Sequence, residues 1–449
     1  MSNIFRAYDV RGVYPQELNE EIAGRIAEAT AKFLNTHSAS SGQAKKIVVG
    51  EDARVSSPAL RKAVLDGITK AGCDVIYIGQ STTPLFYFSV NKLNADGGIM
   101  VTASHNPPEY NGLKIVGKGS IPISVDTGLL EIKKISEGDS VKEGSLGSIK
   151  DVLLKNEYIN FLLNESKSIF DKARDLKIVI DASNGMTPLV LSELLPKMGL
   201  NVSPLYFEID GTFHNHLSDT SREENLKDLK SKVIAEKADV GIAFDGDGDR
   251  MAVIDENGNV VRADMITALL YEYFYKGKKI AYDSRFSKAV KNILGDNSVI
   301  SKTGHSFMKT TMRENDCDFG GELSGHFFFK EMNYADSAIL AMLRLVEMLA
   351  KENKPISQLV APFIKYANSG EINIRFEGDK KDLINTLKKK YSNGKISELD
   401  GITVEYPDGW FNVRFSNTEP IVRVVVEANT KELMKSKKDE LVSGIKKAP

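Results

Sequence analysis

The sequence predicts an α/β protein with three related mixed α/β domains and a smaller C-terminal α+β domain. Three observations predict this fold: a strand-helix-strand pattern recurs three times, an unusual polar loop closes each repeat, and apolar and polar residues alternate after about Pro362. At 449 residues the chain exceeds what one hydrophobic core usually organises, and 42% hydrophobic residues suffice for several cores.

The three repeats open alike, with a short apolar run that ends at an acidic turn. These runs cover residues 46–52, 177–181 and 279–283. A helical stretch follows each run, at 57–71, 188–198 and 287–294. A second apolar run comes next, at 74–78, 202–206 and 299–301. Recurrent β-α-β units predict parallel strands within mixed sheets.

The repeats also close alike, with an apolar run that leads into a polar loop. The loops are T-A-S-H-N-P at 102–107, D-G-D-G-D-R at 245–250 and G-E-L-S-G-H at 321–326. Open α/β sheets bind ligands outside the carboxyl ends of their strands, where these loops are expected. We therefore expect the chemistry of the protein in these loops.

The last part of the chain has a different pattern. Residues 371–376 alternate between polar and apolar side chains, and residues 422–426 are four valines and one arginine. Both patterns are typical of strands in an antiparallel sheet. We expect four domains, at residues 1–150, 151–254, 255–364 and 365–449.

Composition argues against several classes of partner. The net charge is −2 and no basic face stands out, which argues against nucleic acid. No apolar run approaches the roughly 20 residues of a membrane span, and the N-terminus lacks the core of a signal peptide. The two cysteines, Cys73 and Cys317, lie far apart, as in proteins of a reducing compartment. We expect a cytoplasmic protein that is a monomer or a small homo-oligomer.

The acidic loop predicts a metal site. Extended backbone would place the carboxylates of Asp245, Asp247 and Asp249 on one side, and the glycines between them would let the loop bend around one hard cation such as Mg²⁺. Arg250 beside these acids indicates that an anion shares the metal. A solvated turn is the alternative, and an EF-hand would find its twelfth-position acid in Glu256. The EF-hand fails because Arg250 takes the required glycine position and the flanks are strand-like.

The first loop places the hydroxyl of Ser104 beside the imidazole of His105. The loop is either a polar turn capped by serine or the carrier of a covalent phosphoryl group. The acidic loop favours the second interpretation, because a cation held by three carboxylates and a phosphoserine oxygen would neutralise charge during phosphoryl transfer.

The motifs together resemble a known family. The three loops and R-F-S-N-T-E-P at 414–420 occur in the order found in the α-D-phosphohexomutases. The segments F-R-A-Y-D-V-R-G at 5–12 and K-T-G-H at 302–305 look like the bacterial phosphomannomutase/phosphoglucomutase branch. The resemblance covers nearly the whole chain. It implies four domains around a central cleft and the interconversion of hexose 6-phosphate and hexose 1-phosphate with Mg²⁺, through a phosphoserine and a hexose 1,6-bisphosphate that turns over in the cleft.

The resemblance also implies roles for individual residues. Ser104 would carry the phosphoryl group and share the metal with Asp245, Asp247 and Asp249. Arg11 and Lys114 would manage protons near the reacting oxygen, with His105 and Arg250 beside them. The hexose phosphate would contact a set of residues from several loops: Tyr8, Arg285, His305, Glu322, Ser324, His326, Arg414, Ser416, Asn417 and Thr418.

Two of these groups also follow from their chemistry. A carboxylate and a hydroxyl, as in Glu322 and Ser324, can hold adjacent sugar hydroxyls in either orientation, although a polar loop with a helix cap is the alternative. The guanidinium of Arg414 and the small donors at 416–418 suit the phosphate that is not transferred, although such a stretch can also be a capped turn.

The sequence leaves substrate choice open. Arg285 stands where some relatives have lysine, and Leu323 replaces the methionine or glutamine that often separates the branches. The resemblance favours mannose and glucose phosphates, with a phosphoglucosamine mutase as the alternative. A metal-dependent sugar phosphatase and a non-catalytic sugar-phosphate sensor remain as other functions.

Overall fold

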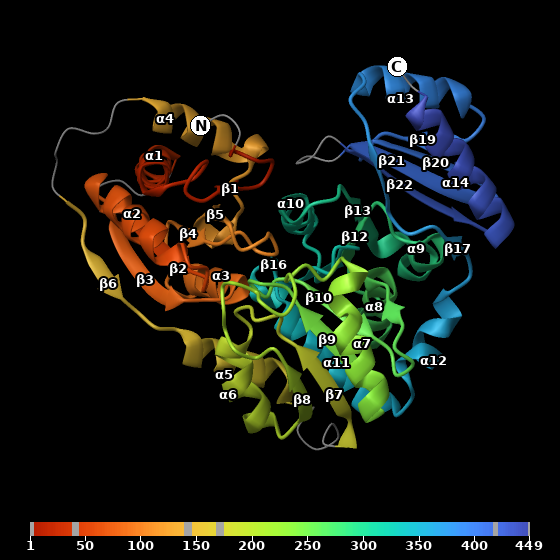
Figure 1. Cartoon of the computed structure of the whole chain (residues 1–449), viewed down its shortest axis with the longest axis horizontal. Coiled ribbons are helices and arrows are strands. Elements are labelled where there is room, and N and C mark those ends of the chain that lie inside the picture. Colours follow the sequence, from red (N-terminus) through yellow and green to blue (C-terminus); the bar gives the residue numbers. More distant parts are fainter. Residues whose placement is uncertain (1–3, 38–44, 139–145, 168–174, 416–420, 448–449) are drawn as a thin grey trace. The chain divides into compact units, whose positions relative to one another are not determined.

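The computed structural model describes residues 4–37, 45–138, 146–167, 175–415 and 421–447. The chain forms two compact units. The first unit comprises Met1–Ala263 and Ser324–Ser357, and the second comprises Asp264–Leu323 and Gln358–Pro449. Figure 1 labels most of the helices and strands of both units.

The first sheet of unit 1 has the order β1-β5-β4-β2-β3-β6. Its strands are β1 (Val10–Val13), β2 (Lys46–Glu51), β3 (Asp74–Gln80), β4 (Gly97–Val101), β5 (Tyr110–Gly117) and β6 (Ile149–Asp151). Strands β2, β3, β4 and β6 pair in parallel, while β5 is antiparallel to β4 and to β1. The accompanying helices are α1 (Glu20–His37), α2 (Ser57–Lys70), α3 (Thr83–Lys92) and α4 (Leu130–Glu137).

Helices cover both faces of this sheet. Successive residues of a strand face opposite sides, and on β4 Gly97 faces Leu34 of α1 while Gly98 faces Phe86 of α3. The core between the sheet and α1, α2 and α4 includes Val49, Val64 and Ile132, all fully buried. Burial on both faces explains why β2 and β4 are continuously apolar in the sequence.

The second sheet of unit 1 has the order β11-β10-β9-β7-β8. Its strands are β7 (Lys177–Asp181), β8 (Asn201–Leu205), β9 (Val240–Phe244), β10 (Met251–Ile254) and β11 (Val260–Val261). Strand β7 is parallel to β8 and β9, and β10 is antiparallel to β9 and β11. The helices are α5 (Lys155–Glu165), α6 (Pro188–Met198) and α7 (Lys227–Glu236). Leu229 and Val233 of α7 pack with Val179 and Ala243 of the sheet.

The third repeat contributes strands to both units. In unit 2, β12 (Ile280–Asp283) is parallel to β13 (Ser298–Ser301) and to β14 (Phe319–Gly321). In unit 1, β15 (Phe327–Phe329) is antiparallel to β16 (Ala335–Asp336). The helices of this part are α8 (Ala263–Leu270), α9 (Lys288–Leu294), α10 (His305–Asn315), α11 (Ala338–Glu352) and α12 (Ile356–Val360).

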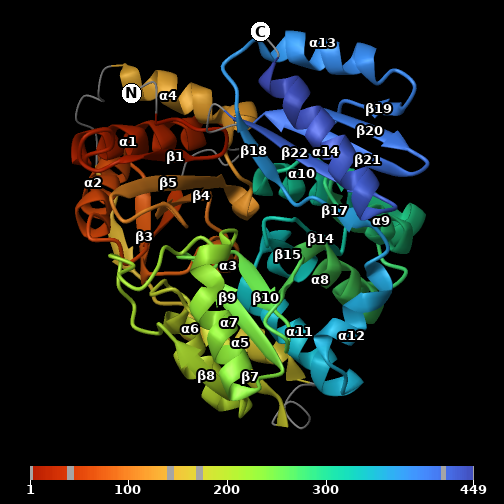
Figure 2. The same ribbon diagram turned by 45° about the vertical axis from the view of Figure 1, so that its right-hand side comes forward.

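The C-terminal part of unit 2 is an α+β structure. Its sheet has the order β17-β22-β21-β20-β19, and β18 also pairs with β22. These antiparallel strands are β17 (Ala367–Asn368), β18 (Ile372–Arg375), β19 (Lys395–Ser397), β20 (Ile402–Tyr406), β21 (Gly409–Phe415) and β22 (Ile421–Ala428). Figure 2 shows helices α13 (Lys380–Lys390) and α14 (Lys431–Lys446) beside this sheet. Leu387 and Leu441 of these helices pack in the same hydrophobic core as the strands.

Short helical turns connect several of these elements. They are η1 (Lys118–Ser120), η2 (Val125–Leu129), η5 (Glu223–Leu226), η6 (Tyr271–Tyr275), η7 (Gly295–Asn297), η8 (Lys330–Met332) and η9 (Ala361–Phe363). Among the described residues, no helix is both long and apolar enough to cross a membrane.

The predicted fold class is confirmed. The three strand-helix-strand repeats are β2-α2-β3, β7-α6-β8 and β12-α9-β13. In each repeat the strand that precedes the polar loop, β4, β9 or β14, is parallel to the first strand of its repeat. The polar loops therefore follow equivalent strand ends, as the sequence predicts.

Candidate active site

The acidic loop after β9 gathers three carboxylates in the interior of unit 1. Asp245 and Asp247 are fully buried, Asp249 is 2% exposed, and ligand atoms of the three lie within 4.8 Å of one another. The loop is a turn rather than the extended backbone expected from the sequence: Oδ1 of Asp245 accepts hydrogen bonds from the backbone N–H groups of Gly248, Asp249 and Arg250, each at 3.1 Å. Gly248 closes this turn with φ of 74°.

Ser104 meets the acidic loop. Its side chain follows β4 and is 1% exposed. Its hydroxyl donates a hydrogen bond to Oδ2 of Asp245 at 3.1 Å and lies 3.2 Å from Nδ1 of His105. The backbone of Ser104 is left-handed, with φ of 52°. The structure thus joins the two loops that the sequence singled out.

Arg54 holds the serine loop and was missed by the sequence analysis. Its guanidinium is 1% exposed and donates hydrogen bonds to four carbonyl oxygens, of Ser104 at 2.8 Å, Asn106 at 2.7 Å, Pro107 at 2.7 Å and Tyr110 at 3.0 Å. The position of Arg54 just after β2, at the ligand-binding end of a parallel strand, could have indicated its role from the sequence. Arg54 fixes the backbone on which Ser104 stands.

Lys114 on β5 neutralises part of the acidic loop. Its Nζ lies 2.6 Å from Oδ2 of Asp247 and 2.5 Å from Oδ2 of Asp249. Burial alone would lower the pKa of Lys114, but these two carboxylates outweigh burial and raise the pKa well above its ordinary value. The ammonium group is therefore protonated at neutral pH.

The donor set fits a Mg²⁺ ion. It consists of oxygens only, from Asp245, Asp247, Asp249 and Ser104, which is the chemistry that Mg²⁺ prefers. Oδ1 of Asp247 is buried and makes no hydrogen bond with any residue that the structure describes, so this oxygen is available to a cation.

Burial and neighbouring charges set the protonation of Asp245, Asp249 and His105. Burial, with the charges of Asp249 and Asp247, raises the pKa of Asp245 well above its ordinary value. Burial acts in the same direction on Asp249, but Lys114 and His326 outweigh it and hold the pKa of Asp249 well below the ordinary range. Burial, with the charges of Arg250 and Arg11, lowers the pKa of His105 well below its usual value. The imidazole of His105 is therefore neutral at neutral pH.

Arg11 on β1 contacts the serine loop from another side. Its Nη1 donates to Oδ1 of Asn106 at 2.6 Å and to the carbonyl oxygen of Ala103 at 3.2 Å. Asp9 fixes the same guanidinium through Nε, at 2.9 Å. Tyr8, in the bend before β1, is partly buried.

Arg250, Ser324 and His326 border the acidic loop in unit 1. Nε of Arg250 lies 3.8 Å from Oδ2 of Asp245 and 3.3 Å from Nε2 of His326. The same Nε2 is 3.3 Å from Oδ1 of Asp249, and the hydroxyl of Ser324 lies 2.8 Å from Nδ1 of His326. Unit 1 therefore brings together these three residues with Ser104 and the acidic triplet.

Unit 2 holds the other predicted site residues. Glu322 is 1% exposed and accepts a hydrogen bond from the backbone N–H of Gly304 at 2.6 Å, directly before His305 begins α10. Ser324 belongs to unit 1, so the predicted sugar-binding pair is divided between the units. Ser416, Asn417 and Thr418 lie outside the described residues.

Glu371 joins two predicted site residues of unit 2 and was missed by the sequence analysis. Its Oε2 accepts hydrogen bonds from Nη1 of Arg285 at 2.7 Å and from Nη2 of Arg414 at 2.9 Å. Arg423 lies 3.3 Å from Oε1. Burial raises the pKa of Glu371, but the three arginines outweigh it and lower the pKa to about 2. The register of the C-terminal sheet, which the sequence does not show, brings this carboxylate to Arg414 and Arg423, and Arg285 reaches it from the loop after β12.

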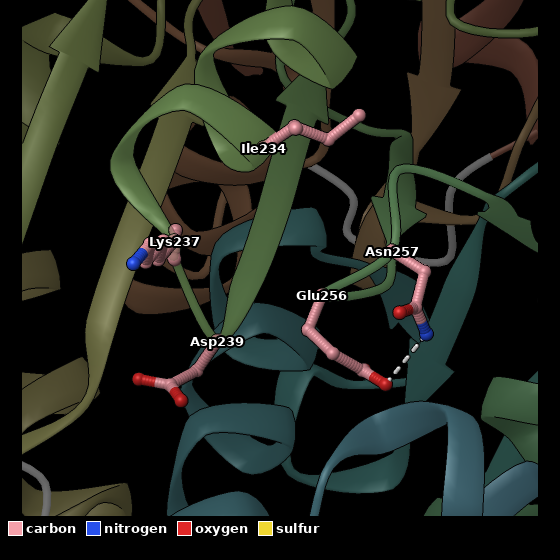
Figure 3. A pocket seen from close by; sticks show the side chains of 6 residues that line it. Ile234, Lys237, Asp239, Glu256 and Asn257 are labelled. Atoms are coloured by element: carbon pink, nitrogen blue, oxygen red, sulfur yellow. Dashed lines mark hydrogen bonds between the residues drawn. The ribbon is translucent and has the colours of Figure 1, made fainter.

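A separate hollow of about 460 Å³ lies at the other end of β9 (Figure 3). Its lining residues are Ile234, Lys237, Ala238, Asp239, Glu256 and Asn257. Asp239 precedes β9 and Asp245 follows it, so the length of the strand separates this hollow from the acidic triplet. Glu256 accepts hydrogen bonds from Asn257 and Ser357 and is not part of the triplet, which removes the EF-hand alternative.

Comparisons with known proteins agree along the whole chain. Models of the phosphoglucomutase/phosphomannomutase family match in succession: alpha/beta/alpha domain I at residues 2–141, domain II at 156–258, domain III at 262–366 and the C-terminal domain at 371–443. A phosphomannomutase of Methanocaldococcus jannaschii is 39% identical over 453 residues, which cover 99% of this chain and 98% of that protein.

Two further relatives give the same result. A phosphomannomutase/phosphoglucomutase of Pseudomonas aeruginosa is 36% identical over 441 residues, covering 96% of this chain and 93% of that protein. The crystal structure of a phosphoglucomutase/phosphomannomutase family protein from Burkholderia thailandensis matches with a TM-score of 0.88 at 31% identity, covering 100% of this chain and 98% of that one.

Proposed function

Since the chain belongs to the phosphoglucomutase/phosphomannomutase family, we propose that this phosphohexomutase acts on mannose and glucose phosphates through a phosphoserine at Ser104. The observation that carries the proposal is the hydrogen bond from the Ser104 hydroxyl to Asp245, at 3.1 Å, within a buried carboxylate triplet. A serine beside three carboxylates is suited to phosphoryl transfer only if a cation offsets their charge. The names of the relatives support the choice of sugars.

Four residues of unit 1 would hold Mg²⁺: Asp245, Asp247, Asp249 and Ser104. When bound, the ion would neutralise charge that develops on the transferred phosphoryl group. Lys114, already bound to Asp247 and Asp249, would keep these carboxylates in place and present a protonated ammonium group near the reacting oxygens.

The remaining residues of unit 1 would position and protect the serine. Neutral His105 can exchange a hydrogen bond with the Ser104 hydroxyl, and Arg11 fixes the loop through Asn106. Arg250, Ser324 and His326 would place cationic and polar groups beside the transferred phosphoryl group.

Unit 2 would bind the sugar and the phosphate that is not transferred. We assign the sugar hydroxyls to Glu322, with Arg285 and His305 beside it, and the phosphate to the guanidinium of Arg414. Tyr8, Ser416, Asn417 and Thr418 are assigned to substrate by the resemblance alone. A hexose 1,6-bisphosphate would form and turn between the two half-reactions.

We also propose the four domain boundaries as expected, at 1–150, 151–254, 255–364 and 365–449. The family matches support this division because their borders fall within nine residues of these positions.

A coupled assay tests the function. Mannose, glucose and glucosamine 1-phosphates would be supplied with Mg²⁺, with and without glucose 1,6-bisphosphate, while 6-phosphate formation and phosphate release are followed separately. We expect isomer formation from mannose and glucose phosphates that depends on Mg²⁺. Preference for the glucosamine ester would identify a phosphoglucosamine mutase, phosphate release without isomer would identify a phosphatase, and binding without turnover a sensor.

A further inference from the structure

Two arginines of the C-terminal sheet face each other directly. Strands β21 and β22 pair Arg414 with Arg423 in antiparallel register. Like charges at directly opposed positions repel each other and destabilise a sheet. Glu371 lies next to β18, whose Asn373 pairs with Arg423, so the Glu371 carboxylate reaches both guanidinium groups.

Glu371 is the carboxylate that binds Arg414 directly, while the charge of Asp283 also acts on Arg414 without a direct bond. Arg414 is 5% exposed, and Glu371 is the only acidic side chain bound to it among the described residues. Its Nε is buried without a hydrogen bond to any described residue. Arg285 differs, because Asp283 holds it through Nε and Nη2 in addition to the bond to Glu371.

We propose that Glu371 is a positioning residue that competes with the substrate's non-transferring phosphate for Arg414. This inference rests on the proposed function of Arg414. Oε2 of Glu371 accepts a hydrogen bond from Nη2 of Arg414, at 2.9 Å. A phosphate that binds this donor must therefore displace the carboxylate. Binding is then an exchange of one anion for another, which limits the affinity for phosphate.

The exchange has a consequence for a bisphosphate that must turn within the site. Release of one phosphate from Arg414 would leave a buried cation unpaired, which is costly. Glu371 removes that cost by returning to Arg414 whenever the phosphate leaves. Its carboxylate is permanently charged at neutral pH, because its pKa lies near 2.

A competing role and a purely structural role of Glu371 predict opposite changes in phosphate affinity when its carboxylate is removed. If Glu371 only held the arginines in place, its loss would weaken phosphate binding. If it competes, Glu371→Gln keeps the size of the side chain, removes the charge and tightens binding. We expect calorimetric titration with inorganic phosphate to show affinity increased about tenfold in Glu371→Gln at constant ionic strength.

Matched variants locate the effect. Glu371→Asp keeps the charge on a shorter side chain, so its increase in affinity should be smaller than that of Glu371→Gln. Glu377→Gln removes the same charge from an exposed side chain paired with exposed Arg375 and should bind phosphate like the wild type. In the double variant Glu371→Gln with Arg414→Ala, the increase should vanish, because the contested guanidinium is gone.

Kinetics give a second readout. Tighter ground-state binding should lower both KM and kcat for hexose phosphate in Glu371→Gln, whereas a structural role would raise KM. Equal or weaker phosphate binding in folded Glu371→Gln overturns the inference; if that variant does not fold, binding by Glu371→Asp no tighter than wild type overturns it. Wild-type phosphate affinity in Arg414→Ala would instead refute the proposed phosphate site itself.

Discussion

The hydroxyl of Ser104 donates a hydrogen bond to Oδ2 of Asp245 at 3.1 Å, although 141 positions separate the two residues. This contact joins a loop of the first repeat to a loop of the second. A phosphoryl group on Ser104 would therefore lie beside the carboxylates proposed to hold Mg²⁺, which determines the first predictions.

Ser104→Ala should remove turnover while leaving the fold intact. The variant has no oxygen to carry phosphate, so we expect a loss of roughly a thousandfold or more. Intact mass and peptide mapping should find phosphate on Ser104 in active wild-type protein. Ser148→Ala, at an exposed serine bound to Asp74, is the matched control. An active preparation without phosphate on Ser104 and without added bisphosphate would refute the mechanism.

Removing one carboxylate of the triplet should weaken metal binding. We expect Asp245→Ala, Asp247→Ala or Asp249→Ala to lower turnover by about a hundredfold or more, since each takes one oxygen ligand from the site. Chelation should abolish turnover, and added Mg²⁺ should restore it. Calorimetric titration with Mg²⁺ checks the affinity. Glu256→Ala, outside the triplet, should change neither quantity, and full activity in excess chelator would exclude the metal site.

Arg414→Ala should weaken the binding of substrate rather than of metal. Loss of a charge-assisted contact to phosphate is expected to cost about 2 to 3 kcal/mol, roughly 30- to 150-fold in kcat/KM. The demand for added hexose 1,6-bisphosphate should rise as well. Arg375→Ala, at an exposed arginine of the same sheet, serves as control. Kinetics across a bisphosphate titration decide the matter, and a wild-type response would leave Arg414 with a structural role.

Arg54→Lys should lower kcat with little change in KM. Lysine cannot reach the four carbonyl oxygens that Arg54 binds, so buried acceptors of the serine loop lose their donors. A misplaced Ser104 hydroxyl should lower kcat roughly 10- to 100-fold. Arg61→Lys on α2 makes the same exchange beside Glu51 and should behave like the wild type. Unchanged kcat in Arg54→Lys would contradict the positioning role.

Glu371 should stabilise unit 2 in a pH-dependent manner. Its pKa is lowered from 4.5 to about 2, so its contribution is present above about pH 4.5 and is lost as pH falls toward 2. At pH 7 the unfolding free energy of Glu371→Gln should lie about 1 to 2 kcal/mol below that of the wild type, because solvent screens the ion pairs of this partly exposed side chain. Denaturant titrations between pH 7 and about pH 3 check this. A difference that stays constant over this range would contradict the ion-pair origin.

The sequence predicted those parts of the protein that depend on local pattern. Strand β7 was expected at the residues where it occurs, and the convergence of Asp245, Asp247 and Asp249 followed from alternating acids after an apolar run. The extended backbone expected across the acids was wrong, because Asp245 accepts backbone hydrogen bonds that close a turn, whereas the expected bend at a glycine occurs at Gly248.

Contacts that depend on the register of strands or on distant loops could not be predicted. Arg54 binds carbonyl groups about 50 positions away, and Glu371 reaches Arg414 only through the pairing of β18, β22 and β21. Neither residue stands in a motif. The roles of Ser416, Asn417 and Thr418 stay predictions.

The left-handed backbone at position 104 favours glycine, whereas the proposed reaction requires the hydroxyl of a serine. Glycine adopts φ of 52° without the penalty of roughly 1 kcal/mol that a side chain carries there. The relief of backbone strain by glycine would offset part of the loss of the hydrogen bond to Asp245. Ser104→Gly should therefore remove the proposed phosphoryl acceptor at little cost in the free energy of unfolding.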